Sequence, residues 1–264
     1  MIRLKSAEEV EIIKESAQIL GKAHAEVAKA IKPGVKTKDL DKIADEFIRD
    51  NGGTPSFKNY HGFPSALCIS VNDTVVHGFP SGYEIRESDI ISVDCGVKYK
   101  GFHSDSAYTY PLEGVGPEVL KLLERTYESL FLGIAQAKAG NRIGDVSFAV
   151  QSYVEQFGYG VVRELVGHGV GKDLHEDPEV PNYGKRGKGP KIAAGMVFAI
   201  EPMINMGTKK VIQEKDGWTI KTGDHKPSAH FEHMVAIFED RTEIVTTHEY
   251  IEDSYKFKWR SKSQ

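Results

Sequence analysis

The chain contains the same series of predicted elements twice: two helices followed by a group of strands. Residues 31–52, IKPGVKTKDLDKIADEFIRDNG, align without gaps with residues 137–158, AKAGNRIGDVSFAVQSYVEQFG. Gly34 matches Gly140, and an aspartate and a second glycine match at the same offset of 106 residues. Such internal similarity predicts two related halves, roughly 6–112 and 116–246, whose sheets meet around a central cleft. The alternative is that two helical hairpins share turn chemistry without a common origin.

Capping and turn residues define the predicted elements. Ser6 and Glu9 form a capping box, and apolar residues follow at steps of three and four. The predicted helices run from Ser6 to Lys32, from about Leu40 to Asn51, from Pro117 to Gly140 and from Asp145 to Gln156. Strands are predicted over 66–110 and around 161–167, 196–205, 217–221 and 229–246.

Composition is that of an ordinary globular enzyme. The chain has 264 residues, 40% of them hydrophobic, and a net charge of −4, which does not predict a protein that coats DNA. Its cysteines, Cys68 and Cys95, are too few for a disulfide framework. The charged N-terminus lacks a signal-peptide core, and no apolar run approaches the roughly 20 residues of a membrane helix. These features predict a cytoplasmic protein without a membrane partner.

Two aspartates lie in one predicted hairpin, VDCGVKYKGFHSDSA, residues 93–107. Lys100-Gly101 provides the turn chemistry. With the turn centred between Tyr99 and Lys100, Asp94 lies directly opposite Asp105. Two carboxylates that face each other destabilise strand pairing, so this arrangement needs a compensating partner.

The second half places further polar residues inside apolar strands. Glu201 ends the run MVFAIEP, Glu232 lies in HFEHMVAIF, and glycines flank His168 in LVGHGVG. For each residue alone, an edge position that faces water is the simpler interpretation. Together with Asp94 and Asp105 they favour a shared cation site, because a buried carboxylate is costly unless it is paired or bound to a cation. Four carboxylates carry a charge of −4, which two divalent cations would neutralise.

At these residues the chain resembles the type I methionine aminopeptidases. The motifs VDCG…GFHSDSA, GHGVG…HEDP, AIEPM and HFEHMV carry the resemblance, which covers the chain to about residue 245. It implies an α/β (α+β) pita-bread fold with central antiparallel sheets, outer helices and a dinuclear metal cleft between two pseudo-twofold halves. A single catalytic domain over 1–264 is expected, with removal of the initiator methionine from nascent polypeptides as its activity.

The resemblance also implies residue roles. Asp105 and Glu232 would bridge two metal ions, Asp94 would complete one site, and His168 with Glu201 the other. Glu201 would also transfer a proton, His175 would steady the tetrahedral intermediate, and His77 would contact the substrate amide. The methionine pocket would be lined by Phe57, Tyr60, Phe63, Cys68, Leu174 and Trp218. Phe57 and Leu174 depart from the bacterial form used for comparison, which has Cys and Phe there, so the shape of the pocket is open.

Other interpretations have less support. GHGVGK lacks the P-loop spacing, and no HExxH or GxSxG motif is present. Another pita-bread peptidase, such as one acting on Xaa-Pro bonds, remains an alternative, as does a non-catalytic binding module of this fold. The short gaps of 33 residues between His168 and Glu201 and 31 between Glu201 and Glu232 favour the type I form over type II.

The expected cofactors are two divalent ions, with Co, Mn, Fe(II) and Zn all compatible with the ligand set. The expected partners are nascent peptides that begin with Met, and family habit implies a monomer. The basic segment KRGKGPK, 185–191, is predicted to be a solvated loop, with contact to ribosomal RNA as a weaker alternative.

Overall fold

A computed structural model describes residues 1–259, which form five α-helices, two short 3₁₀ segments and fifteen strands. The helices are α1 (Ala7–Ala30), α2 (Thr37–Asp50), α3 (Pro117–Ile134), α4 (Ile143–Val154) and α5 (Glu249–Ser254). The first eight strands are β1 (Thr54–Pro55), β2 (Leu67–Val71), β3 (Thr74–Val76), β4 (Ile90–Tyr99), β5 (Phe102–Pro111), β6 (Gly160–Val161), β7 (Gly167–Gly169) and β8 (Glu176–Val180). The remaining strands are β9 (Val197–Ile200), β10 (Met203–Asn205), β11 (Val211–Gln213), β12 (Ile220–Thr222), β13 (Ser228–His230), β14 (His233–Ile237) and β15 (Thr242–Ile244).

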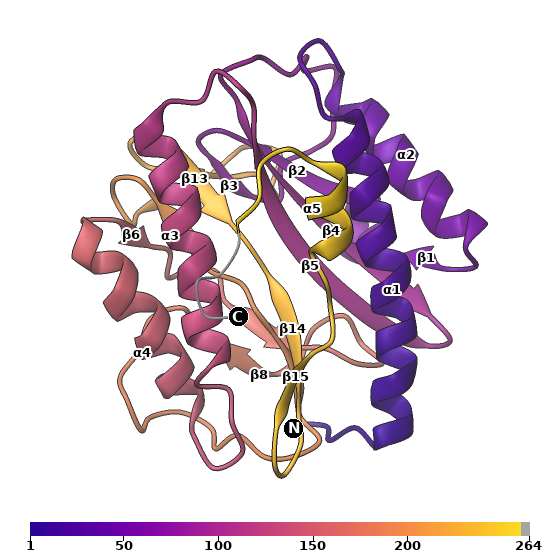
Figure 1. The fold of residues 1–264 in the computed structure, drawn as a ribbon, viewed down its shortest axis with the longest axis vertical. Helices are drawn as coiled ribbons and strands as arrows, with labels where there is room; N and C mark the ends of the chain where they lie inside the picture. The colour runs from indigo at the N-terminus through magenta and orange to yellow at the C-terminus, as the bar shows by residue number, and fades with distance from the viewer. Residues whose placement is uncertain (260–264) are drawn as a thin grey trace.

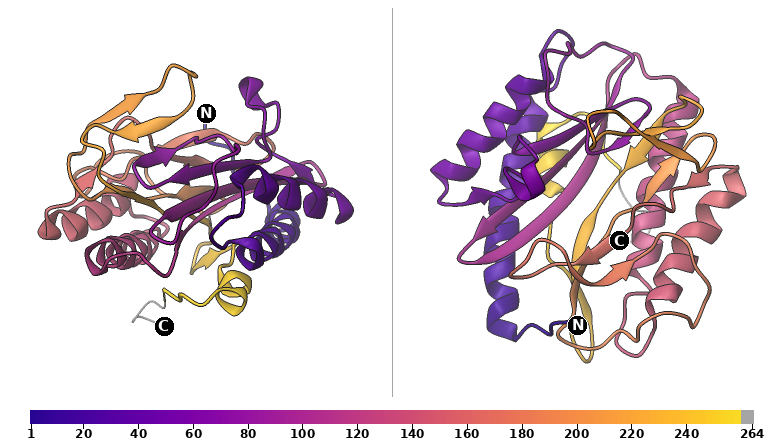
Figure 2. Two further views of the ribbon diagram at one scale, coloured as in Figure 1. Left: turned by 90° about the horizontal axis from the view of Figure 1, so that it is seen from above. Right: turned by 180° about the vertical axis from the view of Figure 1, so that it is seen from behind.

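The strands and helices form separate layers. Figure 1 shows α1 and α2 over one half of the strands and α3 and α4 over the other, with β5 and β14 between them. Viewed from above, the helices lie on one side of the sheets, and the hairpin of β11 and β12 stands out on the opposite side (Figure 2). All the strand pairings are antiparallel. The helices therefore leave one face of the sheets free for a site.

The helix predictions are largely confirmed. The Ser6–Glu9 capping box starts α1, and α2 and α4 begin 106 residues apart, at Thr37 and Ile143. The third helix is shorter than predicted and ends at Ile134. Beyond it, amides donate to the carbonyl three residues earlier instead of four, as the Ala137 amide does to the Ile134 carbonyl. The predicted strand over 161–167 is two short strands, and the sequence reading missed β8, β11 and α5.

The hairpin of β4 and β5 corrects the predicted register. Lys100 and Gly101 both have positive φ, 47° and 86°, and form the two-residue loop, so Tyr99 pairs with Phe102. Such a loop suits the twist of the flanking strands. The centre of the turn lies one residue later than predicted. Asp94 therefore pairs with Ala107, and Asp105 pairs with Gly96.

The corrected register keeps both carboxylates on one face. Side chains on a strand alternate between faces, and Asp105 is two residues from Ala107, the partner of Asp94. The aspartates are thus diagonal neighbours on the face away from the helices. The prediction that they lie directly opposite each other is wrong, but the prediction that they lie close together is confirmed.

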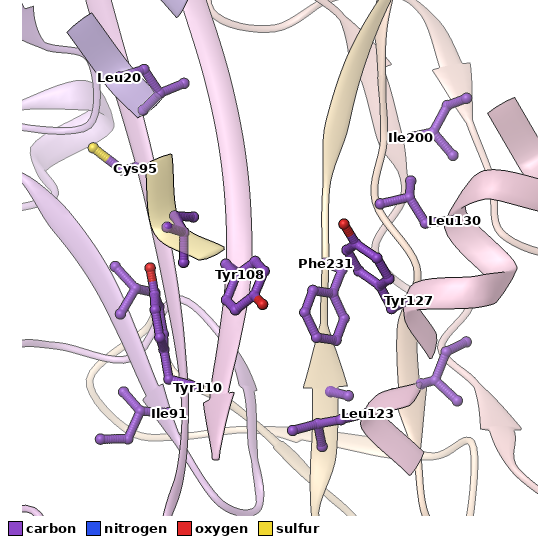
Figure 3. Packing of buried hydrophobic residues seen from close by; sticks show 14 of the residues in the cluster. Leu20, Ile91, Cys95, Tyr108, Tyr110, Leu123, Tyr127, Leu130, Ile200 and Phe231 are labelled. Atoms are coloured by element: carbon purple, nitrogen blue, oxygen red, sulfur yellow. The ribbon is translucent and has the colours of Figure 1, made fainter. Parts of the chain in front are cut away.

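The two halves join along β5. The Glu232 amide donates a hydrogen bond to the Ala107 carbonyl at 3.0 Å. Beneath this junction lies the main core, where Tyr108 of β5 and Tyr127 of α3 both pack edge-to-face on Phe231, each with ring centroids 5.2 Å apart (Figure 3). Such aromatic contacts add to the gain from apolar burial. Among residues 1–259, no helix combines the length and apolar character needed to cross a bilayer.

Candidate metal and substrate site

One cavity of about 170 Å³ brings together every residue that the sequence predicted for the site. Its lining contains the predicted metal ligands Asp94, Asp105, His168, Glu201 and Glu232, both predicted histidines, His77 and His175, and all six predicted pocket residues. These residues come from both halves of the chain and from segments as far apart as Phe57 and Glu232. The geometry thus combines a polar cluster and an apolar pocket in one space.

The carboxylates converge at the junction of the halves. Asp105 and Glu232 are buried, while Asp94 and Glu201 keep part of their surface open to the cavity. Glu201 follows directly after β9, and its carbonyl accepts a hydrogen bond from the Asn182 amide at 2.9 Å. The side chains of Asp105, His168 and Glu232 form a group whose ligand atoms all lie within 4.8 Å of one another.

Burial makes this cluster unfavourable without a positive charge. Loss of hydration raises the pKa of Asp94 to about 7 and that of Glu201 to about 7. Desolvation, followed by repulsion from neighbouring carboxylates, raises the pKa of Asp105 and of Glu232 well above their usual range. Close carboxylates disfavour one another's charged form, as does burial.

Several oxygen atoms in the cluster have no neutralising contact. Asp94 Oδ1, Asp105 Oδ1 and Glu232 Oε1 are buried and have no hydrogen-bond partner among the described residues. Buried polar atoms are normally satisfied, and oxygen donors with one imidazole suit hard or borderline divalent ions. The residues present therefore fit the cations that the sequence predicted.

His168 is held in a form suited to binding a cation. Its Nδ1 lies 3.0 Å from the Gly169 carbonyl, to which it donates, so Nε2 carries the free lone pair. Nε2 lies 3.6 Å from Glu201 Oε1 and 3.9 Å from Asp105 Oδ2. Burial lowers the pKa of His168 to about 4, so the ring is neutral near pH 7 and these contacts are not ion pairs.

The glycines beside His168 allow neighbouring strands to approach. A Cβ on Gly167 would lie 2.5 Å from the Ala199 carbonyl oxygen, and one on Gly169 would lie 2.3 Å from that of Asp177. Both distances are shorter than any real contact. The two glycines therefore let the neighbouring strands approach β7 closely, which fixes His168 between β8 and β9.

The other two histidines flank the polar cluster. His175 lies at the mouth, where its Nδ1 is 2.8 Å from the Tyr60 hydroxyl and its ring centroid is 3.9 Å from that of His168. His77 has a positive φ of 58°, a strained conformation that often accompanies function. Burial lowers the pKa of His77 to about 4, so it enters the site as a neutral hydrogen-bonding group.

The apolar end of the cavity is a small aromatic cluster. Phe57, Phe63, Cys68 and Leu174 are buried together, and Tyr60, Phe79 and Trp218 pack against them. Trp218 follows the turn at Gly217 and meets Phe63 edge-to-face, with ring centroids 5.2 Å apart. Phe57 and Leu174, the two departures from the bacterial form, lie within this cluster.

Sequence reasoning missed some lining residues. His230, Val76, Leu165, Val166 and Met203 also line the cavity. The signal for His230 was present, because His230 and Glu232 are two residues apart in extended chain and share a face. The apolar residues carry no signal that separates them from ordinary core.

Comparison with known proteins agrees with the site. The model for metallopeptidase family M24 matches residues 11–239. A methionine aminopeptidase of Clostridium perfringens is 50% identical over 246 residues, which are 93% of this chain and 99% of that protein. The chain belongs to the methionine aminopeptidases of this family. It is also 49% identical, over 246 residues, to methionine aminopeptidase 1 of Bacillus subtilis.

Solved structures identify the pita-bread fold and help to separate the alternatives. The methionine aminopeptidase of Thermotoga maritima matches with a TM-score of 0.91 and 42% identity over 94% of this chain and all of that one. A prolidase of Pyrococcus horikoshii matches with a TM-score of 0.76 at 22% identity, and the match covers 63% of its chain. The latter likeness shows the shared fold alone. Family membership makes this aminopeptidase a metal-dependent hydrolase and disfavours the Xaa-Pro and binding-module alternatives.

Proposed function

We propose that this methionine aminopeptidase removes the N-terminal methionine from newly made polypeptides by hydrolysis assisted by two divalent cations, with a preference for a small second residue. One observation carries the proposal. Four carboxylates and His168 converge in the same cavity as an aromatic and aliphatic pocket of the character that a thioether side chain requires.

Two cations fit the charge and the number of donors. Asp105 and Glu232 would each contact both ions, Asp94 would complete one site, and His168 with Glu201 would complete the other. The four carboxylates carry the charge of −4 that two divalent ions offset. When bound, such ions polarise a carbonyl oxygen and lower the pKa of a water molecule.

Three side chains of the protein would transfer the proton, stabilise the transition state and bind the substrate amide. Glu201, at the edge of the cluster and open to the cavity, would take a proton from the attacking water and pass it to the leaving amine. His175, held by the Tyr60 hydroxyl, would donate to the oxygen that becomes negative in the transition state. His77 would hold the amide of the scissile bond, since its neutral ring can donate one hydrogen bond without adding charge.

The apolar cluster would bind the methionine side chain. Trp218 and Phe63 provide aromatic faces and Cys68 a polarisable atom, which suit a thioether. The second residue would lie beside His77 and the rim of the cleft. The proposed preference for a small second residue rests on family membership and on the expectation that the cleft is closed beside His77.

The setting of the reaction follows from the substrate. Nascent chains are made in the cytoplasm, and we assign the enzyme to that compartment as a monomer. Residues 185–191 are exposed, which agrees with the predicted solvated loop. A ribosome contact through this loop is part of the proposal and is tested by replacing its basic residues and measuring sedimentation with ribosomes.

The test of the proposed function is a peptide panel with the enzyme reloaded with each divalent metal in turn. Peptides that begin Met-Ala, Met-Gly and Met-Ser should release free methionine rapidly, and Met-Arg and Met-Leu peptides should react slowly. Faster cleavage of Xaa-Pro peptides with another first residue would overturn the proposal. Activity per bound metal, from elemental analysis of the same samples, should level off at two ions per chain.

A further inference from the structure

His230 lines the metal cavity beside the five predicted ligands and has no role in the proposed function. Its side chain is 1% exposed and lines the same cavity. Its Nε2 atom is buried and has no hydrogen-bond partner among the described residues. A ring nitrogen in that position loses its hydration without gaining a contact, so it requires a partner that the protein atoms do not provide.

Strand pairing and hydrogen bonds hold the backbone of His230 beside the cavity. His230 ends β13, where it pairs with Met203 of β10. Its amide donates to Thr109 Oγ1 at 3.0 Å, and its carbonyl accepts from the same hydroxyl at 2.7 Å. Because that hydroxyl's only proton goes to His230, the Ser92 hydroxyl, 2.8 Å away, donates to it. These hydrogen bonds fix the backbone of His230 at the end of β13, from which its side chain lines the cavity.

The contacts of Glu201 show what the ring faces. His230 Nε2 lies 3.5 Å from Glu201 Oε2, and His168 Nε2 lies 3.6 Å from Glu201 Oε1. His230 and Asp94 line the same cavity and influence each other electrostatically. The imidazoles of His230 and His168 therefore lie at nearly equal distances from the two oxygens of the Glu201 carboxylate.

The distance between His230 Nε2 and Glu201 Oε2 distinguishes a hydrogen bond from a pair of ligands on one metal ion. An N–H···O hydrogen bond normally spans 2.7–3.2 Å, shorter than the 3.5 Å found here. Two donors of one ion, each about 2.0–2.2 Å from it, lie about 3–3.5 Å apart. The 3.5 Å separation of His230 Nε2 and Glu201 Oε2 therefore matches two ligands of one ion. The 3.6 Å between His168 Nε2 and Glu201 Oε1, a pair that the resemblance assigns to one ion, is close to it.

We infer that His230 Nε2 is a further protein donor to the metal centre, on the ion that Glu201 binds. The inference rests on the proposed metal site and adds a second nitrogen to it. Imidazole favours Zn, Fe, Co and Ni over Mn, which prefers oxygen donors. The centre of this chain therefore selects borderline ions more strongly than one with a single histidine.

The test uses Co(II) binding to the full chain after removal of metal with a chelator. His230→Gln retains an amide that can donate a hydrogen bond but is a poor ligand, and His230→Ala removes both properties. His168→Gln removes a proposed ligand, and His225→Gln makes the same change at an exposed surface histidine. Calorimetry gives affinity and stoichiometry, the visible spectrum reports the ligand field, and thermal unfolding checks the fold of each variant.

Proton NMR of the Co(II)-loaded proteins counts bound imidazoles directly. Wild type should show two strongly shifted imidazole signals that remain in the His225→Gln protein. His230→Gln and His168→Gln should each lose one. Both His230 variants should bind one of the Co(II) ions at least about tenfold less tightly, with altered visible bands.

Different failures have different meanings. If wild type binds no Co(II), the proposed metal site itself is wrong. If wild type binds Co(II) but His230→Gln retains its affinity, its spectrum and every shifted imidazole signal, the inference about His230 is overturned. Loss of binding in His230→Ala alone would likewise overturn it and assign His230 to hydrogen bonding.

Discussion

Glu201 is the residue at which the proposed metal and proton roles meet. Its side chain faces the cavity, while its carbonyl is held by Asn182 at 2.9 Å. Replacement by Gln removes a ligand charge and the proton acceptor, so kcat/KM should fall at least about 10²–10⁴-fold on Met-Ala peptides. Steady-state kinetics at saturating metal measure this, and near-wild-type activity would remove Glu201 from both roles.

Thermal unfolding in chelator controls for damage to the fold. Glu201→Gln leaves the backbone hydrogen bond in place and removes one charge from a crowded cluster. The variant should therefore unfold at the same temperature as wild type or a higher one. A lower unfolding temperature would mean that the activity loss reports instability.

Trp218 tests the methionine pocket. Trp218→Ala removes an aromatic wall of the pocket. The loss of an apolar contact worth about 1–3 kcal/mol in the transition state should lower kcat/KM for Met peptides roughly 10–200-fold. Metal content should stay the same, because Trp218 packs in the apolar cluster, whose members include no predicted metal ligand. Ile212→Ala is the matched control, since Ile212 is on the same hairpin but 50% exposed. If Trp218→Ala loses metal or unfolds while keeping its specificity, Trp218 belongs to the core.

Residue identities were the part of the site that sequence indicated best. Each predicted ligand lies in a motif of its own, and a carboxylate inside an apolar strand is unusual enough to be noticed. His230 was missed although it lies two residues before Glu232, because alternation along a strand shows which side chains share a face and not which of them face a cavity. The assigned roles remain predictions that the experiments above test.

At the scale of elements, the short turn after β3 positions His77. Gly78 follows it, and a Cβ there would lie 2.2 Å from the Ile69 carbonyl oxygen. Gly78→Ala should destabilise the protein by about 1–3 kcal/mol, as overpacking typically does, and should lower kcat by displacing His77. Chemical denaturation and kinetics measure the two effects.

Gly82→Ala provides the control in the same segment. A Cβ at Gly82 meets nothing within 4 Å, so this variant should match wild type in stability and kcat. Equal effects of the two substitutions would mean that glycine acts there through chain entropy and not through close approach.

The repeat of elements extends further than the aligned segments. Gly34 and Gly140 both have positive φ, and the isolated bridges of Lys36 to Glu84 and Arg142 to Lys191 start 106 residues apart. β1 and β6 also begin at that offset, at Thr54 and Gly160. We propose that the halves share an origin and form one catalytic domain, which agrees with donors that come from both.

Errors in the predicted elements have local causes. The hairpin register was wrong because turn residues show that a turn exists, while its centre depends on which two residues take positive φ. β11 and α5 were missed because each is short, with three and six residues, and each carries charged or exposed residues that hide periodicity. Tertiary contacts, which a single sequence does not display, stabilise them.

For the whole molecule, the buried carboxylates couple folding to pH and metal. The pKa of Asp94 and of Glu201 is about 7 in the folded chain, above the unfolded values of 3.8 and 4.5. Between about pH 4 and 7 the folded chain thus holds protons that the unfolded chain releases. Stability without metal should therefore fall as pH rises through this window and level off above it.

Cations should reverse that trend. Protons compete for the same oxygens, so the affinity for Co(II) or Mn(II) should rise from pH 5 to 7, with about tenfold per pH unit for each proton released. Calorimetry in buffers of different ionisation enthalpy counts those protons, and melting curves with and without metal give the stability. An affinity independent of pH would contradict the raised pKa values.

The closed apolar end of the cavity would admit a single side chain of a bound peptide. Phe63, Cys68 and Leu174 are at most 5% exposed, so a peptide that enters past the carboxylates meets a wall after a single side chain. An internal segment of a protein would have to continue through that wall in order to place its amide at the metal. If the proposed pocket binds the first side chain, only a free chain end would fit there, and the shape of the cavity would select the N-terminal peptide bond.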